Sequence, residues 1–129
     1  MTPEARAHVD RAREDLDEAR KIADIGLPGA AARSAYFAAF HAAEALIIER
    51  AGKVAKTHSG VRAEFARLLK SASGAERPLL KFLAQAYKYK EISDYGVGMS
   101  AVVVDRDDRE AIKSASLFVD RVVELMVAR

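Results

Sequence analysis

The stretch RSAYFAAFHAAEALI, Arg33 to Ile47, decides the fold, because it is apolar on every side of a helix and yet carries the strongly polar side chains of Arg33, His41 and Glu44. At roughly 100° per residue, the phenylalanines of the stretch fall within about 40° of Arg33, and alanines line the opposite side. This pattern predicts a central helix with several neighbours, which approach closely on the alanine side. Its polar side chains, Arg33, His41 and Glu44, then need partners on other helices, so a site or an interface is expected there.

Periodic apolar residues extend this interpretation to the whole chain. They recur at intervals of three and four, which predicts about five helices and no strand. The expected helices run from Pro3 to near Gly26, from about Gly29 to Ala51, from the KTHSG turn at 56–60 to Ser73, from about Glu76 to Asp94, and from the acidic stretch at 105–110 to Met126. Short links favour antiparallel neighbours, so we predict an all-α fold, an up-down helical bundle of four to five helices in a single domain, residues 1–129.

Composition limits the setting and the chemistry. The chain has no cysteine, no apolar run long enough to span a bilayer, and a charged helical pattern at its start in place of a signal peptide. We therefore expect a cytoplasmic protein with no membrane segment. The sequence also contains no phosphate loop and no cluster of metal ligands, since His8, His41 and His58 are far apart. We expect neither a metal nor a cofactor.

Charge is distributed unevenly along the chain. Residues 49–90 contain ten Lys or Arg and three Glu, a net charge of +7, although the whole chain carries only +2. Such a segment favours an anionic partner, such as RNA, or an acidic protein partner. The alternative is that these charges are the solvated faces of two surface helices.

The KTHSG turn at 56–60 places a lysine, a histidine and small polar residues at the start of the third expected helix. The free amides and the positive dipole end of a helix N-terminus attract anions. We therefore predict an anion-binding group at this turn. Its members are Lys53, Lys56, His58, Ser59 and Arg62. The alternative is that Thr57 or Ser59 simply caps the helix, which explains the residue types without a ligand.

The stretch YGVGMSAVVV, Tyr95 to Val104, is long and apolar for a link between two helices. It either covers the bundle as an ordered arm or forms an apolar patch used in self-association.

Four features in a fixed order carry a resemblance to a known family. They are ARSAYFAAFHAAEALI, KTHSGVRAEFARLL, YKYKEISDYG and a closing helix. As a set they resemble the HEPN superfamily, and most closely its branch of uncharacterised small bacterial and archaeal HEPN-domain proteins. The resemblance extends from about Arg20 to Met126. It implies an up-down bundle, usually a homodimer, which is often encoded beside a nucleotidyltransferase partner or acts in toxin-antitoxin and defence systems.

The resemblance also bears on catalysis. Many HEPN proteins are metal-independent ribonucleases, whose Arg-to-His motif lies in the stretch that matches KEISDYG here. Such cleavage needs a base for the RNA 2′-hydroxyl, an acid for the leaving oxygen and a cation for the phosphate. Lys90 takes the place of the motif's arginine, Asp94 lies near the place of its histidine, and Tyr95 follows. Lysine lacks the planar fork of arginine, and an aspartate repels the substrate, so the motif is not intact.

The resemblance further implies that the arginine of the central helix and the Asp-Tyr pair share one cleft. We therefore expect a polar cluster with Arg33 paired to Asp94. The expected members are Arg33, His41, Lys90, Asp94 and Tyr95. Within it, His41 is predicted to be a hydrogen-bonded core histidine, paired with Glu44 or Asp94.

Two functional hypotheses follow from these residues. The first is a binding and interaction module that has lost catalysis, with RNA or a nucleotidyltransferase as its partner. The second is a metal-independent endoribonuclease with an atypical active site, for which Lys90, Asp94, His41 and His58 are the candidate catalytic residues.

Overall fold

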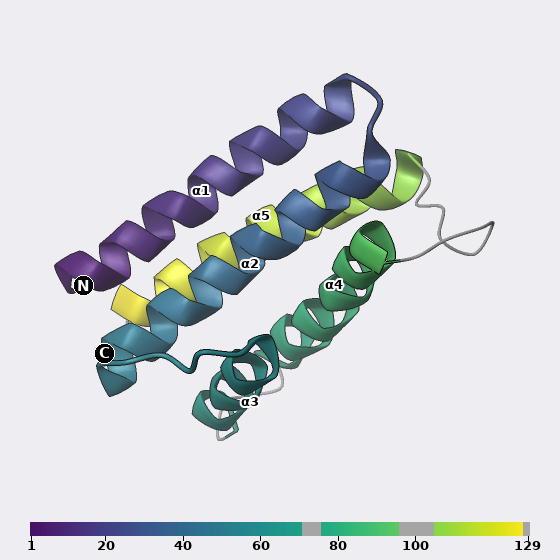
Figure 1. The fold of residues 1–129 in the computed structure, drawn as a ribbon. Coiled ribbons are helices and arrows are strands. Elements are labelled where there is room, and N and C mark those ends of the chain that lie inside the picture. Colours follow the sequence, from purple (N-terminus) through teal and green to yellow (C-terminus); the bar gives the residue numbers. More distant parts are fainter. Residues whose placement is uncertain (71–75, 96–104, 128–129) are drawn as a thin grey trace.

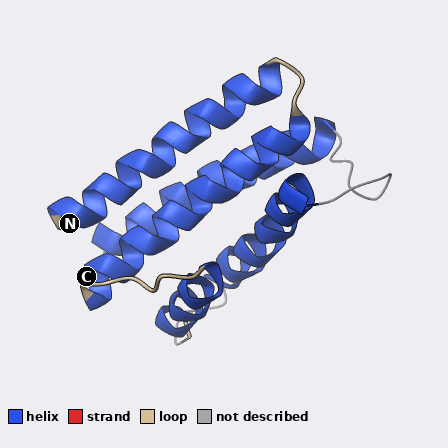
Figure 2. Ribbon diagram, viewed as in Figure 1, coloured by secondary structure: helices blue, strands red, loops and turns tan. Residues whose placement is uncertain are grey.

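The computed structural model describes residues 1–70, 76–95 and 105–127, apart from the side chains of residues 89, 92–95 and 105–107. Within these residues the chain forms five helices and no strand (Figure 1, Figure 2). The helices are α1 (Pro3–Asp24), α2 (Pro28–Ala51), α3 (His58–Leu68), α4 (Arg77–Tyr95) and α5 (Asp105–Val127). The predicted all-α fold is therefore confirmed.

The helix predicted to be central is central. α2 contacts each of the other four helices, and Figure 1 shows it between α1 and α4 with α5 behind it. Eight of its twelve fully buried residues are alanines. Because alanine side chains are small, neighbouring helix backbones approach α2 closely, and the aromatic side chains gather on its remaining side.

The helix ends follow from local sequence. Thr2 caps α1 by accepting a hydrogen bond from the backbone N–H of Ala5 at 3.2 Å, and Pro3 occupies the first helical position. Gly26 turns the chain from α1 into α2 with a φ of 81°, a conformation that side chains other than glycine rarely adopt. Gly52 ends α2 in the same left-handed region, and its N–H donates to the carbonyl of Ile48.

The ends of α3 differ from the predicted bounds or lie outside the described residues. α3 begins at His58, earlier than the end of the KTHSG turn, because Thr57 caps it, and it ends at Leu68 with Leu69 as its C-cap. The predicted end at Ser73 lies outside the described residues. The same holds for most of the apolar stretch from Tyr95 to Val104, so both interpretations of that stretch stay predictions. None of the helices in the described part of the chain is both long and apolar enough to cross a membrane.

Candidate functional site

Five rings from three helices form what we call the aromatic cluster: Tyr36, Phe37 and Phe40 from α2, His58 from α3 and Tyr87 from α4. The His58 ring stacks on Phe40, with the ring centres 4.4 Å apart. The hydroxyl of Tyr36, a fully buried residue, lies 2.7 Å from Nδ1 of His58. α3 thus begins with a histidine whose ring packs into the bundle rather than standing in solvent.

Cations surround this cluster. The guanidinium of Arg62 lies over the Tyr87 ring, 4.0 Å from its centre, and the ammonium of Lys90 is 5.9 Å from the same ring. The guanidinium of Arg33 lies 4.8 Å from the centre of Phe37. The Nη1 atom of Arg62 is buried and has no hydrogen-bond acceptor among the described residues. An acceptor from a ligand would complete its hydrogen bonding.

The electrostatic setting favours neutral forms of both polar ring groups. Burial is the main cause that lowers the pKa of His58, and the charges of Lys90, Arg62 and Arg33 lower it further, against an opposing effect of Glu91. Burial also raises the pKa of Tyr36, opposed by the Arg62 charge. His58 is therefore a neutral ring held in a cationic environment.

The structure divides the predicted anion-binding group in two. His58 and Arg62 belong to the aromatic cluster and its rim. Lys53 and Lys56 are exposed and line a different hollow of about 470 Å³, which they share with Glu64 and Arg67. The five residues named from sequence therefore do not surround one point, because the chain between Gly52 and α3 carries the two lysines away from the His58 ring.

Thr57 caps α3 at this turn. Thr57 Oγ1 accepts a hydrogen bond from the backbone N–H of Gly60 at 3.0 Å, and Ser59 Oγ lies 3.4 Å from Thr57 Oγ1. The capping alternative therefore explains Thr57. Anion binding by the turn itself stays a prediction.

His41 is hydrogen-bonded, but its main partner differs from those predicted. Its Nδ1 lies 2.7 Å from Oδ2 of Asp15 on α1, and its Nε2 lies 4.0 Å from Oε1 of Glu44. Asp15 is 3 % exposed and also pairs with Arg11, whose Nε is 3.3 Å from Oδ1. Burial raises the pKa of Glu44, opposed mainly by the charge of His41. Sequence reasoning missed Asp15, although it lies on the apolar stripe of α1, three residues after Ala12.

The predicted polar cluster is only partly described. Lys90 lies beside the aromatic cluster, and Arg33 is exposed on its rim. The side chains of Asp94 and Tyr95 lie outside the described residues, so the predicted pair of Arg33 and Asp94 stays a prediction. The Phe37 ring contacts both histidines, with its centre 6.1 Å from that of His41 and 5.8 Å from that of His58.

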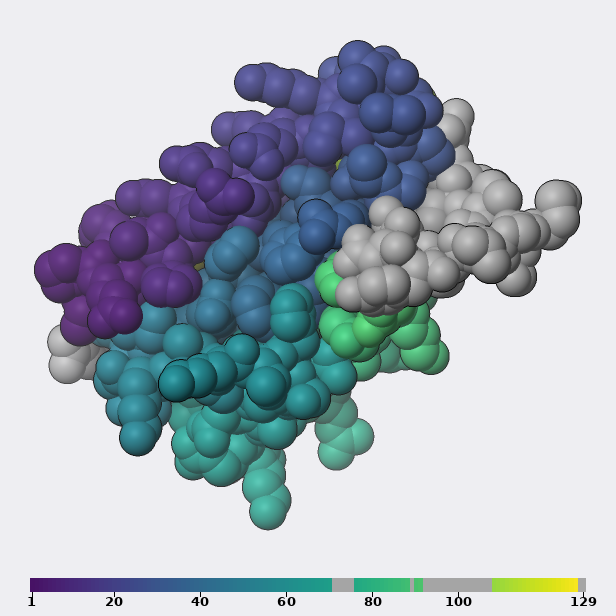
Figure 3. All heavy atoms as spheres, viewed as in Figure 1, coloured from purple at the N-terminus to yellow at the C-terminus, as the bar shows by residue number. Residues whose placement is uncertain are grey.

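The two histidines therefore face different surroundings. His58 lies at the junction of α2, α3 and α4 among cations, whereas His41 lies between α1 and α2 beside carboxylates. In the space-filling view, a strip of α2 reaches the surface between α1 and the region of α3 (Figure 3). The described residues contain no group of three His, Cys, Asp or Glu side chains able to hold a metal ion.

Comparison with known proteins places the chain among relatives of one kind. The sequence model of the HEPN domain matches residues 5–128. A UPF0332 protein from Gloeobacter violaceus is 28% identical over 126 residues, which cover 98% of each chain. A UPF0332 protein from Thermotoga maritima is 28% identical over 117 residues, which cover 90% of this chain and 86% of the relative. Neither relative's name states an activity.

Proposed function

The chain belongs to the HEPN domain family, and from this premise we propose that it is a non-catalytic module that binds RNA. The binding surface is the cationic rim of the aromatic cluster around His58, where Arg33 is exposed, Arg62 is half-buried and Lys90 is buried. The module acts as a homodimer, together with a nucleotidyltransferase-family partner in a toxin-antitoxin or defence-type system, in the cytoplasm.

The observation that supports RNA binding best is the state of Arg62. Its guanidinium is held in place by the Tyr87 ring, while its buried Nη1 has no acceptor among the described residues. A phosphate oxygen is the acceptor that suits a guanidinium best, because the bond is assisted by charge. With Lys90 and Arg33 nearby, one or two phosphates of a flexible strand can be neutralised without any base being read.

The lack of catalysis rests on the proton-transfer groups. Cleavage of RNA by 2′-hydroxyl attack needs a base and an acid on opposite sides of the phosphate. His58 supplies one imidazole beside the cations, but the second histidine, His41, is bound to Asp15 of α1. By the resemblance to HEPN ribonucleases, Lys90 takes the place of the motif's arginine and Asp94 lies near the place of its histidine.

RNA binding is tested by fluorescence anisotropy of a labelled single-stranded RNA over a series of salt concentrations. Each phosphate contact on a single strand contributes roughly 0.7 to the slope of log K against log salt, so Arg62→Gln with Lys90→Gln should flatten the slope by about 1.4. Lys113→Gln, an exposed change on α5, is the matched control and should leave the slope unchanged. Binding that is absent at low salt, or equally weakened by the control, contradicts the proposal.

A second candidate function is supported by His58 alone. Its lowered pKa leaves the ring neutral near neutral pH and able to accept a proton, with Arg62 and Lys90 close enough to act on it. A metal-independent endoribonuclease centred on His58 would cleave single-stranded RNA in EDTA to cyclic-phosphate ends. If the protein only binds RNA, as proposed, the wild type should cleave no more RNA than the His58→Gln variant does. Cleavage that is lost in His58→Gln, with melting temperature and RNA affinity unchanged, would replace the binding proposal by this one.

The proposed partner is tested at the level of the genome and the complex. A nucleotidyltransferase gene beside this one, whose product forms a stable complex with the purified chain, is the expected result. A purified neighbour product that does not bind the chain contradicts this part of the proposal and leaves RNA binding unaffected.

A further inference from the structure

The bond between Tyr36 and His58 depends on which nitrogen of the imidazole carries the proton. A neutral imidazole has one N–H, on Nδ1 or on Nε2, and its other nitrogen is an acceptor. The Tyr36 hydroxyl lies 2.7 Å from Nδ1, so it either donates to a bare Nδ1 or accepts from an Nδ1–H. The two arrangements give Nε2 opposite chemistry. In the first it is a hydrogen-bond donor, and in the second it is an acceptor that could serve as a base.

The surroundings of the Tyr36 hydroxyl distinguish the two arrangements. Tyr36 is fully buried, so its hydroxyl proton needs an acceptor inside the bundle. Arg62 is close enough to this hydroxyl to lower its pKa by charge and by hydrogen bonding. A guanidinium only donates, so Arg62 cannot receive the hydroxyl proton. Among the described residues, the acceptor within hydrogen-bonding distance is Nδ1 of His58. The Tyr36 hydroxyl therefore donates to Nδ1.

The proton of the neutral ring is then on Nε2. This nitrogen makes no hydrogen bond with any residue that the structure describes, and it is not one of the buried polar atoms that lack a partner, so it reaches the surface. The Phe40 ring stacks on the imidazole, and the Phe37 ring meets it at 78°, which together hold the imidazole plane. His58 thus presents a fixed N–H beside the cations of the rim.

We propose that His58 binds RNA as a hydrogen-bond donor, from Nε2–H to a backbone phosphate oxygen, and that Tyr36 is the positioning residue that sets this tautomer. The same phosphate accepts from the buried Nη1 of Arg62, which adds a charged donor to the neutral one. Because Nε2 carries the proton and the Nδ1 lone pair is bonded to Tyr36, His58 is not a base for attack by a 2′-hydroxyl. This inference rests on the proposed RNA binding and names the atoms that make the contact.

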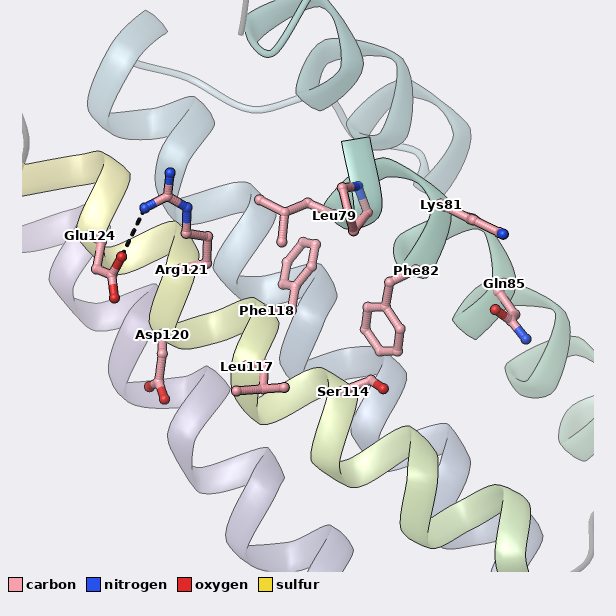
Figure 4. A pocket seen from close by; sticks show the side chains of 11 residues that line it. Leu79, Lys81, Phe82, Gln85, Ser114, Leu117, Phe118, Asp120, Arg121 and Glu124 are labelled. Atoms are coloured by element: carbon pink, nitrogen blue, oxygen red, sulfur yellow. Dashed lines mark hydrogen bonds and ion pairs between the residues drawn. The ribbon is translucent and has the colours of Figure 1, made fainter. Parts of the chain in front are cut away.

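A hollow of about 620 Å³ between α4 and α5 gives a contrast within the same molecule (Figure 4). It also has an arginine in its lining, Arg121, but all three nitrogens of that guanidinium donate to Glu76 or Glu124. Figure 4 shows the bond to Glu124. Arg62, by contrast, keeps a buried Nη1 that has no acceptor among the described residues. The phosphate is therefore assigned to the rim of the aromatic cluster, and the α4–α5 hollow supplies a control position.

The first test reads the tautomer from NMR spectra of ¹⁵N-labelled protein near neutral pH, with His58→Gln identifying the His58 signals. Nε2 should have the chemical shift of a protonated nitrogen, and Nδ1 that of a bare one. In Tyr36→Phe both shifts should move toward each other, because nothing then holds the proton on Nε2. Tyr87→Phe removes another hydroxyl of the aromatic cluster and should leave both shifts in place. A wild type with its proton on Nδ1 overturns the inference, and RNA binding is then still decided by its own titration.

The second test measures the contact with single-stranded RNA by fluorescence anisotropy, with far-UV circular dichroism as the check that each variant is folded. A glutamine amide reaches the position of Nε2, whereas an asparagine amide reaches only that of Nδ1. His58→Gln should therefore keep the affinity within about 3-fold, and His58→Asn should lose about 10-fold, as expected for one hydrogen bond to a charged acceptor.

The salt slope should be the same in both variants, because neither removes a charge. Lys81→Gln, an exposed change in the lining of the α4–α5 hollow, is the control and should leave the affinity unchanged. Equal affinities of His58→Gln and His58→Asn overturn the contact and leave the proposed RNA binding in place. A wild type that binds no RNA overturns both, and the NMR spectra still decide the tautomer.

Discussion

Replacing Asp15 by Asn should destabilise the protein far more than its single lost charge suggests. The carboxylate is buried and accepts from His41 Nδ1 at 2.7 Å, a bond to a charged acceptor that contributes about 1.5 to 3 kcal/mol. The pair with Arg11, which is half exposed, adds less than about 1 kcal/mol. Asn has nearly the same volume, so no cavity forms. The expected loss is about 2 to 3 kcal/mol, a large share of typical stability.

Urea denaturation followed by far-UV circular dichroism measures this loss. For a domain of this size, each kcal/mol corresponds to roughly 4 °C in melting temperature, so Asp15→Asn should melt about 8 to 12 °C lower. Asp17→Asn is the control on the same helix, because Asp17 is 71% exposed and should change stability by less than about 0.5 kcal/mol. In Asp15→Asn the amide nitrogen must face one of the two donors, His41 or Arg11, so adding His41→Gln, which weakens the same contact, should cost less than the sum of the two single changes. Equal melting temperatures of Asp15→Asn and Asp17→Asn would refute the reasoning.

Three further predictions concern α3 and the aromatic cluster. Tyr36→Phe removes the hydroxyl that bonds His58 and should lower the free energy of unfolding by about 1 kcal/mol in urea titrations, with no loss meaning that the bond is not made in solution. The pKa of His58 is lowered in the folded protein, so the unfolded chain binds a proton at this residue more readily. The free energy of unfolding should therefore fall as the pH drops below 6.5, the ordinary pKa of histidine. An identical fall in His58→Gln would show that other groups cause the pH dependence. Thr57→Ala should cost about 1 kcal/mol by removing the cap of α3, whereas Ser59→Ala should cost little, and the reverse order of melting temperatures would assign the cap to Ser59.

The helices were predictable because their signals are local. The turn at Gly26 precedes the central helix α2, and Gly52 ends it. The many alanines of α2 indicate close neighbours on several sides, even when those neighbours are not yet known. The cap of α3 is equally local, since Thr57 bonds a backbone group three residues away.

The site was predictable only in part, because its contacts join distant parts of the chain. Nothing in the sequence around His58 indicates that Tyr36, 22 residues earlier, would bond it, so the contacts of this ring with the bundle were not predicted. His41 was predicted to be bonded to Glu44 or Asp94, and its main partner is instead Asp15. Asp15 was identifiable in principle, since a carboxylate on the apolar stripe of a helix needs a buried partner.

The alanines of α2 have a consequence for synthesis of the chain. During synthesis α1 and α2 leave the ribosome before α4 and α5. Until α4 and α5 have been made, the sides of α2 that they cover in the folded protein are exposed. A helix lined with leucine or isoleucine would expose a larger apolar surface area during that interval, and the attraction between nascent chains grows with this area. Eight buried alanines keep this area small. The helix that contacts every other helix in the finished bundle therefore exposes less apolar area before α4 and α5 are made than a leucine-rich helix would.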